Sequence, residues 1–586
     1  MMKQSTTDQP TAGDTLRARL TYEPKELNFG TSGRRGEVVH LTQLEVYSNV
    51  LAELEYLQSL PPKEGGIVHG QEFYLSYDLR PSSTVYVPEQ QGRGELAQAV
   101  VRAIQDAGML PVNLGQIPTP ALTYYAISRA RGSVMITGSH IPFDRNGYKL
   151  NTSIGELLKK DEEPINQKVR SVRERLYRQS YCDSLFNERG LFKMGHQELP
   201  PETTAGRLSY LERYESFFQN ESLRGKRVLV YQHSAVGRDI LVDILKYFDA
   251  EVIPSGRSER FIPIDTENID DAQLAVVQAI ADEVCVKYGR MDAIVSTDGD
   301  SDRPLILGID SATGQVRFFG GDQVGMVVAE YLQADCVVVP ISCNDGIDRG
   351  RLKDILDPKT RIGSPYVIAA MEKARNKGKQ RICGWEANGG FLTGSDICRN
   401  GRVLKALPTR DALLPILCVL FAAQERGTSL NNLFAVLPKR FSRSALLKEF
   451  PRPVALRLVA KYSPTDPGVQ DVLFAGAQVF LFDENQAKVE PSHTQVRHME
   501  AIRAQLESYF TPEMGFGPIM RLNYTDGVRI LFGNGDVAHF RPSGNADEVR
   551  IYAVADTQAR ANVIAELGGA EPDGILRMME RKMAQT

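Results

Sequence analysis

The stretch KRVLVYQHSAVGRDILVDILKYFDAEVIP, Lys226 to Pro254, decides the fold class of this chain. Its β-branched run at 227–231 predicts a strand, the amphipathic pattern at 239–248 predicts a helix, and 250–254 predicts a second strand. Strands that alternate with helices are typical of α/β domains, because the helices cover the faces of a partly parallel sheet. The sequence therefore predicts an α/β protein.

The same scheme recurs along the chain, at 132–140, 292–310 and 335–356. The stretch 527–555 differs, because strands alternate there around a Gly-Asn-Gly-Asp turn, which predicts an α+β domain. A chain of 586 residues exceeds what one hydrophobic core organises. Periodicity lapses near 205–224, 320–326 and 430–450, and we interpret these three stretches as charged linkers at domain boundaries. We expect four domains, at 1–220, 221–325, 326–440 and 441–586.

Composition excludes several classes of protein. A formal net charge of −4 with mixed signs gives no basic surface for nucleic acid. The longest apolar run, ALLPILCVLFAA, is broken by Pro415 and too short to span a membrane, and the first residues lack a secretory signal, so we expect a cytoplasmic protein with no membrane partner. Seven scattered cysteines without a CxxC pair favour reduced thiols over disulfides or a zinc site.

The motif DGDSDR, 298–303, places three carboxylates at alternate positions in a loop between two predicted strands. A curved backbone can point Asp298, Asp300 and Asp302 at one centre, and hard oxygen ligands suit Mg²⁺. An EF-hand is excluded, because its sixth position holds Arg303 instead of Gly and its twelfth holds Ile309 instead of Glu. We therefore predict a divalent metal site rather than a solvated acidic turn.

Ser139 follows a buried strand, which is where open α/β sheets place active-site loops. His140 is a poor base for it, because adjacent side chains diverge, and a GxSxG motif is absent, so a triad hydrolase is disfavoured. A serine beside Mg²⁺ and cationic side chains can carry a phosphoryl group. In isolation, such a serine is more often a turn residue.

Two further loops offer polar groups for a ligand. GWEANGG, 384–390, presents Glu386 and Asn388 between glycines, which suits hydrogen bonds to vicinal sugar hydroxyls, although alone it would be interpreted as a tight turn. RPSGNADEVR, 541–550, gathers a guanidinium, a hydroxyl and backbone N–H groups as in a phosphate-binding nest. A P-loop nucleotide site is disfavoured, because GxxxxGK[ST] is absent.

Five motifs in order, FGTSGRRG, TGSHIPFDRNGYK, DGDSDR, GWEANGG and RPSGNADEVRIY, resemble those of the α-D-phosphohexomutase superfamily, which includes phosphomannomutases and phosphoglucomutases. They spread from residue 29 to residue 552. The resemblance implies four domains around a central cleft, the first three α/β with mixed sheets and the last a smaller α+β phosphate-binding domain.

The resemblance also implies roles for individual residues. Ser139 would be the phosphoserine, and Asp298, Asp300 and Asp302 would bind Mg²⁺ together with a phosphate oxygen on Ser139. Arg303 would help to orient that phosphate, and His140 would shape the pocket. Arg35 and Lys149 would act beside Ser139, with Lys149 as the candidate general acid and base. The substrate would be held by a sugar loop and a phosphate loop, made of Glu386, Asn388, Gly389, Arg541, Ser543, Gly544 and Asn545.

The activity so implied interconverts hexose 1-phosphate and hexose 6-phosphate, with a hexose 1,6-bisphosphate as intermediate and activator. Mannose phosphate is the first choice, and a phosphoglucomutase or dual-specificity enzyme is the alternative. A non-catalytic phospho-regulated protein and a Mg²⁺-dependent sugar phosphatase are rivals. We expect small-molecule sugar phosphates as partners, no nucleic acid, and a monomer or small homo-oligomer.

The chain departs from the family pattern at several points. Arg34 replaces an apolar residue, Asn388 stands where Ser is frequent, and Asp547 adds an acid that would weaken phosphate binding unless it points outward. Extra residues are expected at 161–180 and 446–470.

Overall fold

The computed structural model describes residues 14–30, 32–267, 269–543 and 547–584. Its contacts divide the chain into two compact units, the first made of 1–318 with 390–421 and the second of 319–389 with 422–586. The four domains expected from the sequence are a finer division, which stays a prediction.

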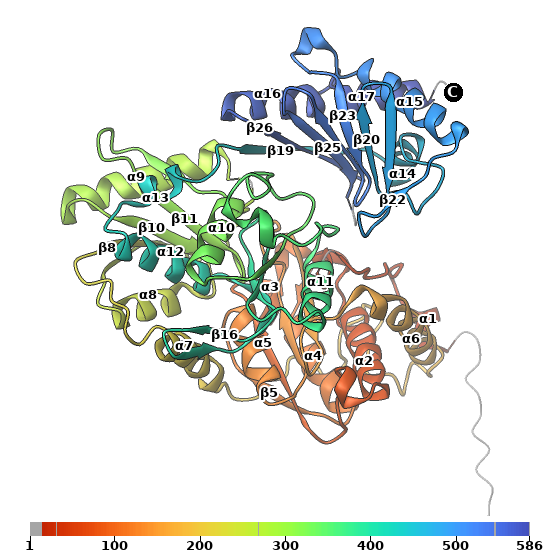
Figure 1. The fold of residues 1–586 in the computed structure, drawn as a ribbon. Coiled ribbons are helices and arrows are strands. Elements are labelled where there is room, and N and C mark those ends of the chain that lie inside the picture. The colour runs from red at the N-terminus through yellow and green to blue at the C-terminus, as the bar shows by residue number, and fades with distance from the viewer. Residues whose placement is uncertain (1–13, 31, 268, 544–546, 585–586) are drawn as a thin grey trace, which may run out of the picture. The chain divides into compact units, whose positions relative to one another are not determined.

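The first unit begins with a mixed five-stranded sheet in the order β1-β7-β6-β2-β5. Strands β2, β5 and β6 run parallel, whereas β1 and β6 both pair antiparallel with β7. The strands span Arg34–Glu37 (β1), Glu72–Tyr77 (β2), Leu110–Asn113 (β5), Ser133–Ile136 (β6) and Arg145–Asn151 (β7). Accompanying helices are α2 (Gln43–Ser59), α4 (Leu96–Asp106), α5 (Thr119–Ile127) and α6 (Lys159–Tyr177), and α2 contacts both α4 and α6 (Figure 1).

Helix α6 accounts for the first extra segment. It buries Ile165, Val169, Val172 and Leu176 at helical spacing, so one apolar face joins the core of the first sheet. Arg34 connects this helix to the sheet, because its guanidinium donates to Glu53 on α2 at 2.6 Å and to Asn166 on α6 at 3.0 Å. The unusual arginine therefore serves packing inside the unit, where its charge is paired.

A second mixed sheet, in the order β12-β11-β10-β8-β9, confirms the α/β pattern of the opening stretch. Strand β8 (Arg227–His233) pairs parallel with β9 (Glu251–Arg257) and β10 (Ala293–Thr297), and α8 (Arg238–Tyr247) connects the first two. Val228, Leu229 and Val230 are fully buried, as expected for a central parallel strand. The sheet continues antiparallel through β11 (Pro304–Ile309) and β12 (Val316–Phe318), and α9 (Asp271–Tyr288) packs on β9 and β12.

The interpretation of the three stretches as linkers was wrong. Ala205–Phe217 forms helix α7, α10 begins at Gly321, and Leu430–Ala435 (α13) and Phe441–Leu447 (β19) occupy most of 430–450. The buried face of α7 is mostly aromatic, with Tyr210, Tyr214 and Phe217 beside a single aliphatic residue, Leu211, so the helical period of aliphatic residues is weak. The hydroxyls of Tyr210 and Tyr214 both donate to the buried carboxylate of Asp411. Asp411 ends β18 (Leu407–Asp411), which pairs antiparallel with β15 (Phe391–Thr393), and a hairpin of β16 (Ile397–Arg399) and β17 (Arg402–Leu404) lies between them in the sequence. Helix α12 spans Leu413–Glu425.

The second unit contains a parallel strand pair, β13 (Cys336–Val338) with β14 (Ile382–Trp385). Helices α10 (Gly321–Tyr331) and α11 (Ser364–Asn376) both contact β14. Helix α13 (Leu430–Ala435) precedes the large antiparallel sheet that ends the chain. Gly325 on α10 lies against the fully buried Trp385, where a Cβ would come within 2.4 Å of the indole. This glycine lets the helix approach the strand that ends at the predicted sugar loop.

The same unit contains an antiparallel eight-stranded sheet, in the order β19-β26-β25-β24-β23-β20-β21-β22, drawn in blue in Figure 1. Its strands are Phe441–Leu447 (β19), Asp471–Ala475 (β20), Gln478–Phe482 (β21), Lys488–Val489 (β22), Ile519–Asn523 (β23), Val528–Phe532 (β24), Val537–Pro542 (β25) and Val549–Ala555 (β26). The helices are α14 (Arg452–Lys461), α15 (His493–Glu507), α16 (Gln558–Gly569) and α17 (Ile575–Ala584). The second extra segment supplies α14 and leads into β20.

Within the described ranges no helix has the length and apolar character needed to cross a membrane. All seven cysteines are free thiols.

Candidate active site

Ser139 occupies a strained position in the turn between β6 and β7. Its φ is +55°, a left-handed conformation that is uncommon outside glycine and that clusters at functional sites. The turn is fixed from below, because the Ser139 backbone N–H donates to Thr137 Oγ1 at 2.7 Å and Thr137 donates to Asp78 at 2.7 Å. The serine is fully buried in this structure.

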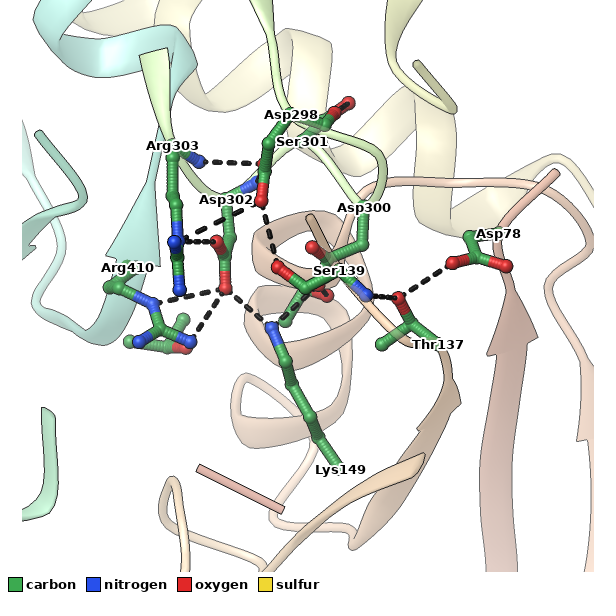
Figure 2. Close-up of polar contacts among 12 residues, drawn as sticks. Asp78, Thr137, Ser139, Lys149, Asp298, Asp300, Ser301, Asp302, Arg303 and Arg410 are labelled. Carbon is green, nitrogen blue, oxygen red and sulfur yellow. Dashed lines mark hydrogen bonds and ion pairs between the residues drawn. The ribbon is translucent and has the colours of Figure 1, made fainter. Parts of the chain in front are cut away.

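The Ser139 hydroxyl meets the loop between β10 and β11. Its Oγ donates to Asp298 Oδ2 at 2.8 Å, across 159 positions of sequence (Figure 2). Gly299 makes this approach possible, since a Cβ there would lie only 2.6 Å from the Ser139 carbonyl oxygen. The glycine of DGDSDR is therefore required by close packing of the two loops.

The three aspartates form the cluster expected for a divalent cation. All three carboxylates are fully buried, and one oxygen from each lies within 4.8 Å of the others. Oδ1 of Asp300 and Oδ1 of Asp302 are buried without a hydrogen-bond donor, which is costly unless a cation binds them. Three oxygen ligands with unsatisfied atoms fit Mg²⁺.

Four cationic side chains surround these carboxylates. Lys149 on β7 donates to Asp300 at 2.6 Å and to Asp302 at 2.5 Å, and Arg410 on β18 grips Asp302 through Nε at 3.0 Å and Nη2 at 2.9 Å (Figure 2). Arg303 Nε lies 3.7 Å from Asp298 and 3.6 Å from Asp302. With Arg35, the cations exceed the carboxylates by one, so the site favours an added anion.

Arg35 lies close to the same charges. Burial and the neighbouring Arg303 lower the pKa of the Arg35 guanidinium to about 10. Its Nε and Nη2 are buried without a hydrogen-bond acceptor. Such N–H groups suit a phosphate oxygen.

The three aspartates differ in the direction of their pKa shifts. Burial, reinforced by the charges of Asp300 and Asp302, raises the pKa of Asp298 to about 8. Burial also disfavours ionised Asp302, but the positive charges of Arg410, Lys149 and Arg303 outweigh it and hold that pKa well below its usual range. The pKa of Asp300 is lowered as well, because Lys149 overcomes burial and repulsion by Asp302.

Arg80 supports the serine turn from behind. Its buried guanidinium donates to the carbonyl oxygens of Ser139 at 2.9 Å, Ile141 at 2.5 Å, Pro142 at 2.7 Å and Arg145 at 3.0 Å. It also stacks on the ring of Phe261, at 3.9 Å from the centroid. One side chain thus holds four carbonyls of the turn that carries Ser139.

The structure brings together the predicted residues of the first unit, including His140, which follows Ser139 in the same turn. Sequence reasoning missed Arg410, Arg80 and Thr119. Thr119, at the start of α5, donates to Asp300 Oδ2 at 2.5 Å. No motif pointed to these residues; their types are ordinary for a buried ion pair or a helix start, and only the fold places them here.

The predicted sugar loop lies in the second unit, at the carboxyl end of β14. Glu386 and Asn388 are buried, and Gly389 has a φ of +87° in a turn where its N–H donates to the Glu386 carbonyl at 2.9 Å. A Cβ at Gly321 would lie 2.1 Å from the Gly389 nitrogen, so the start of α10 packs directly on this loop. The loop is a fixed turn on rigid elements.

The predicted phosphate loop follows β25 in the same unit. Arg541 lies on β25, with Nε 3.5 Å from Asp526 Oδ1, and the Ser543 N–H donates to the Glu548 carbonyl at 2.8 Å. Gly544 and Asn545 lie outside the described residues. The Asp547 carboxylate accepts the Arg452 N–H at 2.8 Å at the start of α14, so this acid stabilises a helix end.

Comparisons with known proteins agree with this geometry. The family model for phosphoglucomutase/phosphomannomutase α/β/α domain I matches residues 26–176, and the model for domain III matches 320–441. The chain is 36% identical to a phosphomannomutase of Salmonella muenchen over 92% of this chain and 94% of the relative. It is 35% identical to a phosphomannomutase of Sinorhizobium fredii over 90% of this chain and 95% of the relative.

A solved structure shares the fold. A phosphoglucomutase/phosphomannomutase family protein of Burkholderia thailandensis superimposes with a TM-score of 0.60 at 16% identity, covering 94% of this chain and 97% of its own.

Proposed function

Because the chain belongs to the phosphoglucomutase/phosphomannomutase family and is a phosphohexomutase, we propose that it interconverts mannose 1-phosphate and mannose 6-phosphate. The choice of mannose is supported by relatives at 35–36% identity that are phosphomannomutases, whereas a phosphoglucosamine mutase of Nitrosospira multiformis is 25% identical. A phosphoglucomutase or dual-specificity activity is the second candidate.

The phosphoryl carrier in this proposal is Ser139. The observation that supports it is the 2.8 Å hydrogen bond from Ser139 Oγ to Asp298, at a buried carboxylate triad with four surrounding cations. A hexose hydroxyl attacks the phosphorus of phospho-Ser139, the bond from phosphorus to Oγ breaks, and a hexose 1,6-bisphosphate forms. The bisphosphate reorients within the site. The phosphoryl group at its other end is then transferred to Ser139 Oγ by the reverse of that step.

The chain's own residues supply the rest of this chemistry. Asp298, Asp300 and Asp302 would hold Mg²⁺, which neutralises charge on the transferring phosphoryl group when bound. Lys149 would act in its unprotonated form, taking the proton of the attacking hydroxyl and passing it to Ser139 Oγ as the phosphorus–oxygen bond breaks. Arg35 and Arg303 bind phosphate oxygens, and Arg410 and Arg80 hold the metal loop and the serine turn in place.

In the second unit, Glu386, Asn388 and Gly389 would bind sugar hydroxyls. Arg541 and Ser543, with Gly544 and Asn545, would hold the phosphate that is not reacting.

The experiment that tests this function is one coupled assay on mannose 1-phosphate, glucose 1-phosphate and glucosamine 1-phosphate, with hexose 1,6-bisphosphate and Mg²⁺ present. Inorganic phosphate is measured in parallel. Isomerisation of mannose 1-phosphate above the other two supports the proposal. Faster glucose 1-phosphate turnover would establish the second candidate, and stoichiometric phosphate release would establish a phosphatase.

A further inference from the structure

One oxygen of the Asp302 carboxylate is fully used by hydrogen bonds. Oδ2 accepts from Arg410 Nε at 3.0 Å, from Arg410 Nη2 at 2.9 Å and from Lys149 Nζ at 2.5 Å (Figure 2). A carboxylate oxygen has about two lone pairs, so three donors leave Oδ2 no capacity for a metal ion. Oδ1 is buried and, within the described residues, accepts no hydrogen bond, since its 3.6 Å ion pair with Arg303 Nε is too long for one. Oδ1 is therefore the atom that remains to bind a cation.

Gly390 leaves room for the side chain of Arg410. A Cβ at Gly390 would lie 2.5 Å from Arg410 Cδ and 2.7 Å from Cγ, closer than carbon atoms approach without a shift. These atoms lie near the start of the side chain, so they cannot move aside without displacing the guanidinium. The φ of Gly390 is outside the left-handed region, so the backbone permits alanine and the glycine is needed for space. Both residues belong to the first unit.

Strand β18 is anchored on both sides of this arginine. The Thr409 hydroxyl donates to Glu156 Oε1 at 2.7 Å. The Asp411 carboxylate accepts the hydroxyl of Tyr210 at 2.6 Å through Oδ1 and the hydroxyl of Tyr214 through Oδ2. Both strand residues are only 1% exposed. Side chains alternate between the faces of a strand, so the two anchors hold the face opposite the arginine and fix the point from which its side chain starts.

We propose that Arg410 is a positioning residue of the metal site, which holds Oδ2 of Asp302 so that Oδ1 is left to bind Mg²⁺. Gly390 and the anchors of β18 keep the guanidinium in place. By charge alone, an arginine beside the site would weaken the binding of a cation, so its contribution must come from geometry. A lysine would keep the charge but lose the planar two-point grip. The inference rests on the metal site of the proposed function.

The first test measures Mn²⁺ binding to the full chain without sugar phosphate, from the electron paramagnetic resonance signal of free Mn²⁺. Arg410→Lys should bind Mn²⁺ about tenfold or more weakly than wild type, since the loss of a group that orients a metal ligand typically costs about tenfold to a hundredfold in affinity. Gly390→Ala should weaken binding in the same direction, because it displaces the arginine without changing any charge. Intact mass checks that all proteins carry equal phosphorylation.

Two matched controls should bind Mn²⁺ as wild type does. Arg402→Lys makes the same exchange at an exposed position of β17, and Gly320→Ala adds a Cβ where no atom lies within 4 Å. Wild-type affinity in Arg410→Lys would overturn the inference and leave the proposed function standing. Absence of Mn²⁺ binding in the wild-type chain would reject the metal site itself, and the inference with it.

The second test asks which oxygen binds the ion. In crystals of the full chain soaked with Mn²⁺, anomalous scattering should place the ion on Oδ1 of Asp302, with Arg410 still on Oδ2. An ion on Oδ2 in place of the guanidinium would overturn the proposal.

The anchors of β18 are tested without any change of charge. Tyr210→Phe and Tyr214→Phe each remove one hydroxyl from Asp411 and should weaken Mn²⁺ binding, whereas Tyr247→Phe, at a position 51% exposed on α8, should not. Thermal unfolding confirms that each variant is folded. Wild-type Mn²⁺ affinity in both folded variants would remove the Asp411 anchor from the proposal.

Discussion

Ser139 Oγ donates a hydrogen bond of 2.8 Å to Asp298 Oδ2, and a Cβ on the neighbouring Gly299 would lie 2.6 Å from the Ser139 carbonyl oxygen. The nucleophile candidate and the metal loop are therefore packed against each other through both side chain and backbone. Position, rather than an unusual residue type, would give this serine the proposed chemistry.

Replacing Ser139 with alanine should abolish mutase turnover and leave the fold intact, because it removes only the group that would carry phosphate. Turnover in the coupled assay and the thermal midpoint check both parts. Ser128→Ala, at the exposed end of α5, is the matched control and should behave as wild type. Full activity in Ser139→Ala would reject the phosphoserine.

Gly299→Ala should separate the metal loop from the serine turn. The added methyl meets a backbone oxygen that cannot swing aside, so we expect kcat to fall by about tenfold or more, together with weaker Mg²⁺ activation. Gly320→Ala is a suitable comparison, since no atom lies within 4 Å of a Cβ there. If both variants keep wild-type kcat, close packing of the two loops is not needed for turnover.

Arg80→Lys should reduce kcat with little change in KM, because the lysine ammonium cannot hold four carbonyls of the serine turn at once. Hydrogen bonds to charged groups are worth about 1.5–3 kcal/mol, so a decrease of about tenfold to a hundredfold is expected. Steady-state kinetics on the preferred hexose phosphate separate the two constants. A raised KM with normal kcat would show that Arg80 acts on substrate binding instead of positioning.

The Arg541→Ala variant should release the bisphosphate before this intermediate reorients, because the variant loses the guanidinium of the predicted phosphate loop. Each escape leaves Ser139 without phosphate, so turnover should depend on added hexose 1,6-bisphosphate far more strongly than in wild type. Activity is measured against bisphosphate concentration for both proteins. The same bisphosphate requirement in both would remove Arg541 from this role.

His539 predicts a pH dependence of stability. Burial lowers the pKa of this histidine to about 4, although its hydrogen bond to the Asp526 carbonyl opposes the decrease. The charges of Arg529 and Arg541 lower the pKa further, whereas the charge of Asp526 raises it. The ring of Tyr552 stacks on the imidazole. The unfolded chain takes up the proton near pH 6.5, so stability is complete above that pH and is lost between about 6.5 and 4, by roughly 3 kcal/mol.

The measurement is the unfolding midpoint of wild type and His539→Gln from pH 7 to pH 4. Other groups titrate in both proteins, so the difference between the two curves isolates His539. That difference should shrink or reverse toward pH 4 as wild type loses its advantage. Parallel curves across this range would contradict a buried neutral histidine.

The sequence by itself determined the α/β class, the strand, helix and strand of 227–254, and the aspartate cluster of DGDSDR, because periodicity and residue spacing are local properties of the chain. It also placed Ser139 at the end of a strand, and five ordered motifs indicated the family before any geometry was known.

Only the tertiary structure decided which distant groups meet. Arg410 reaches Asp302 across 108 positions, and Arg80 reaches Ser139 across 59, through side chains whose types give no sign of such partners. Helix α7 could not be predicted for the same reason, since its tyrosine hydroxyls donate to Asp411 at the end of strand β18. Pairings of this kind depend on how the sheets fold together, which local pattern does not encode.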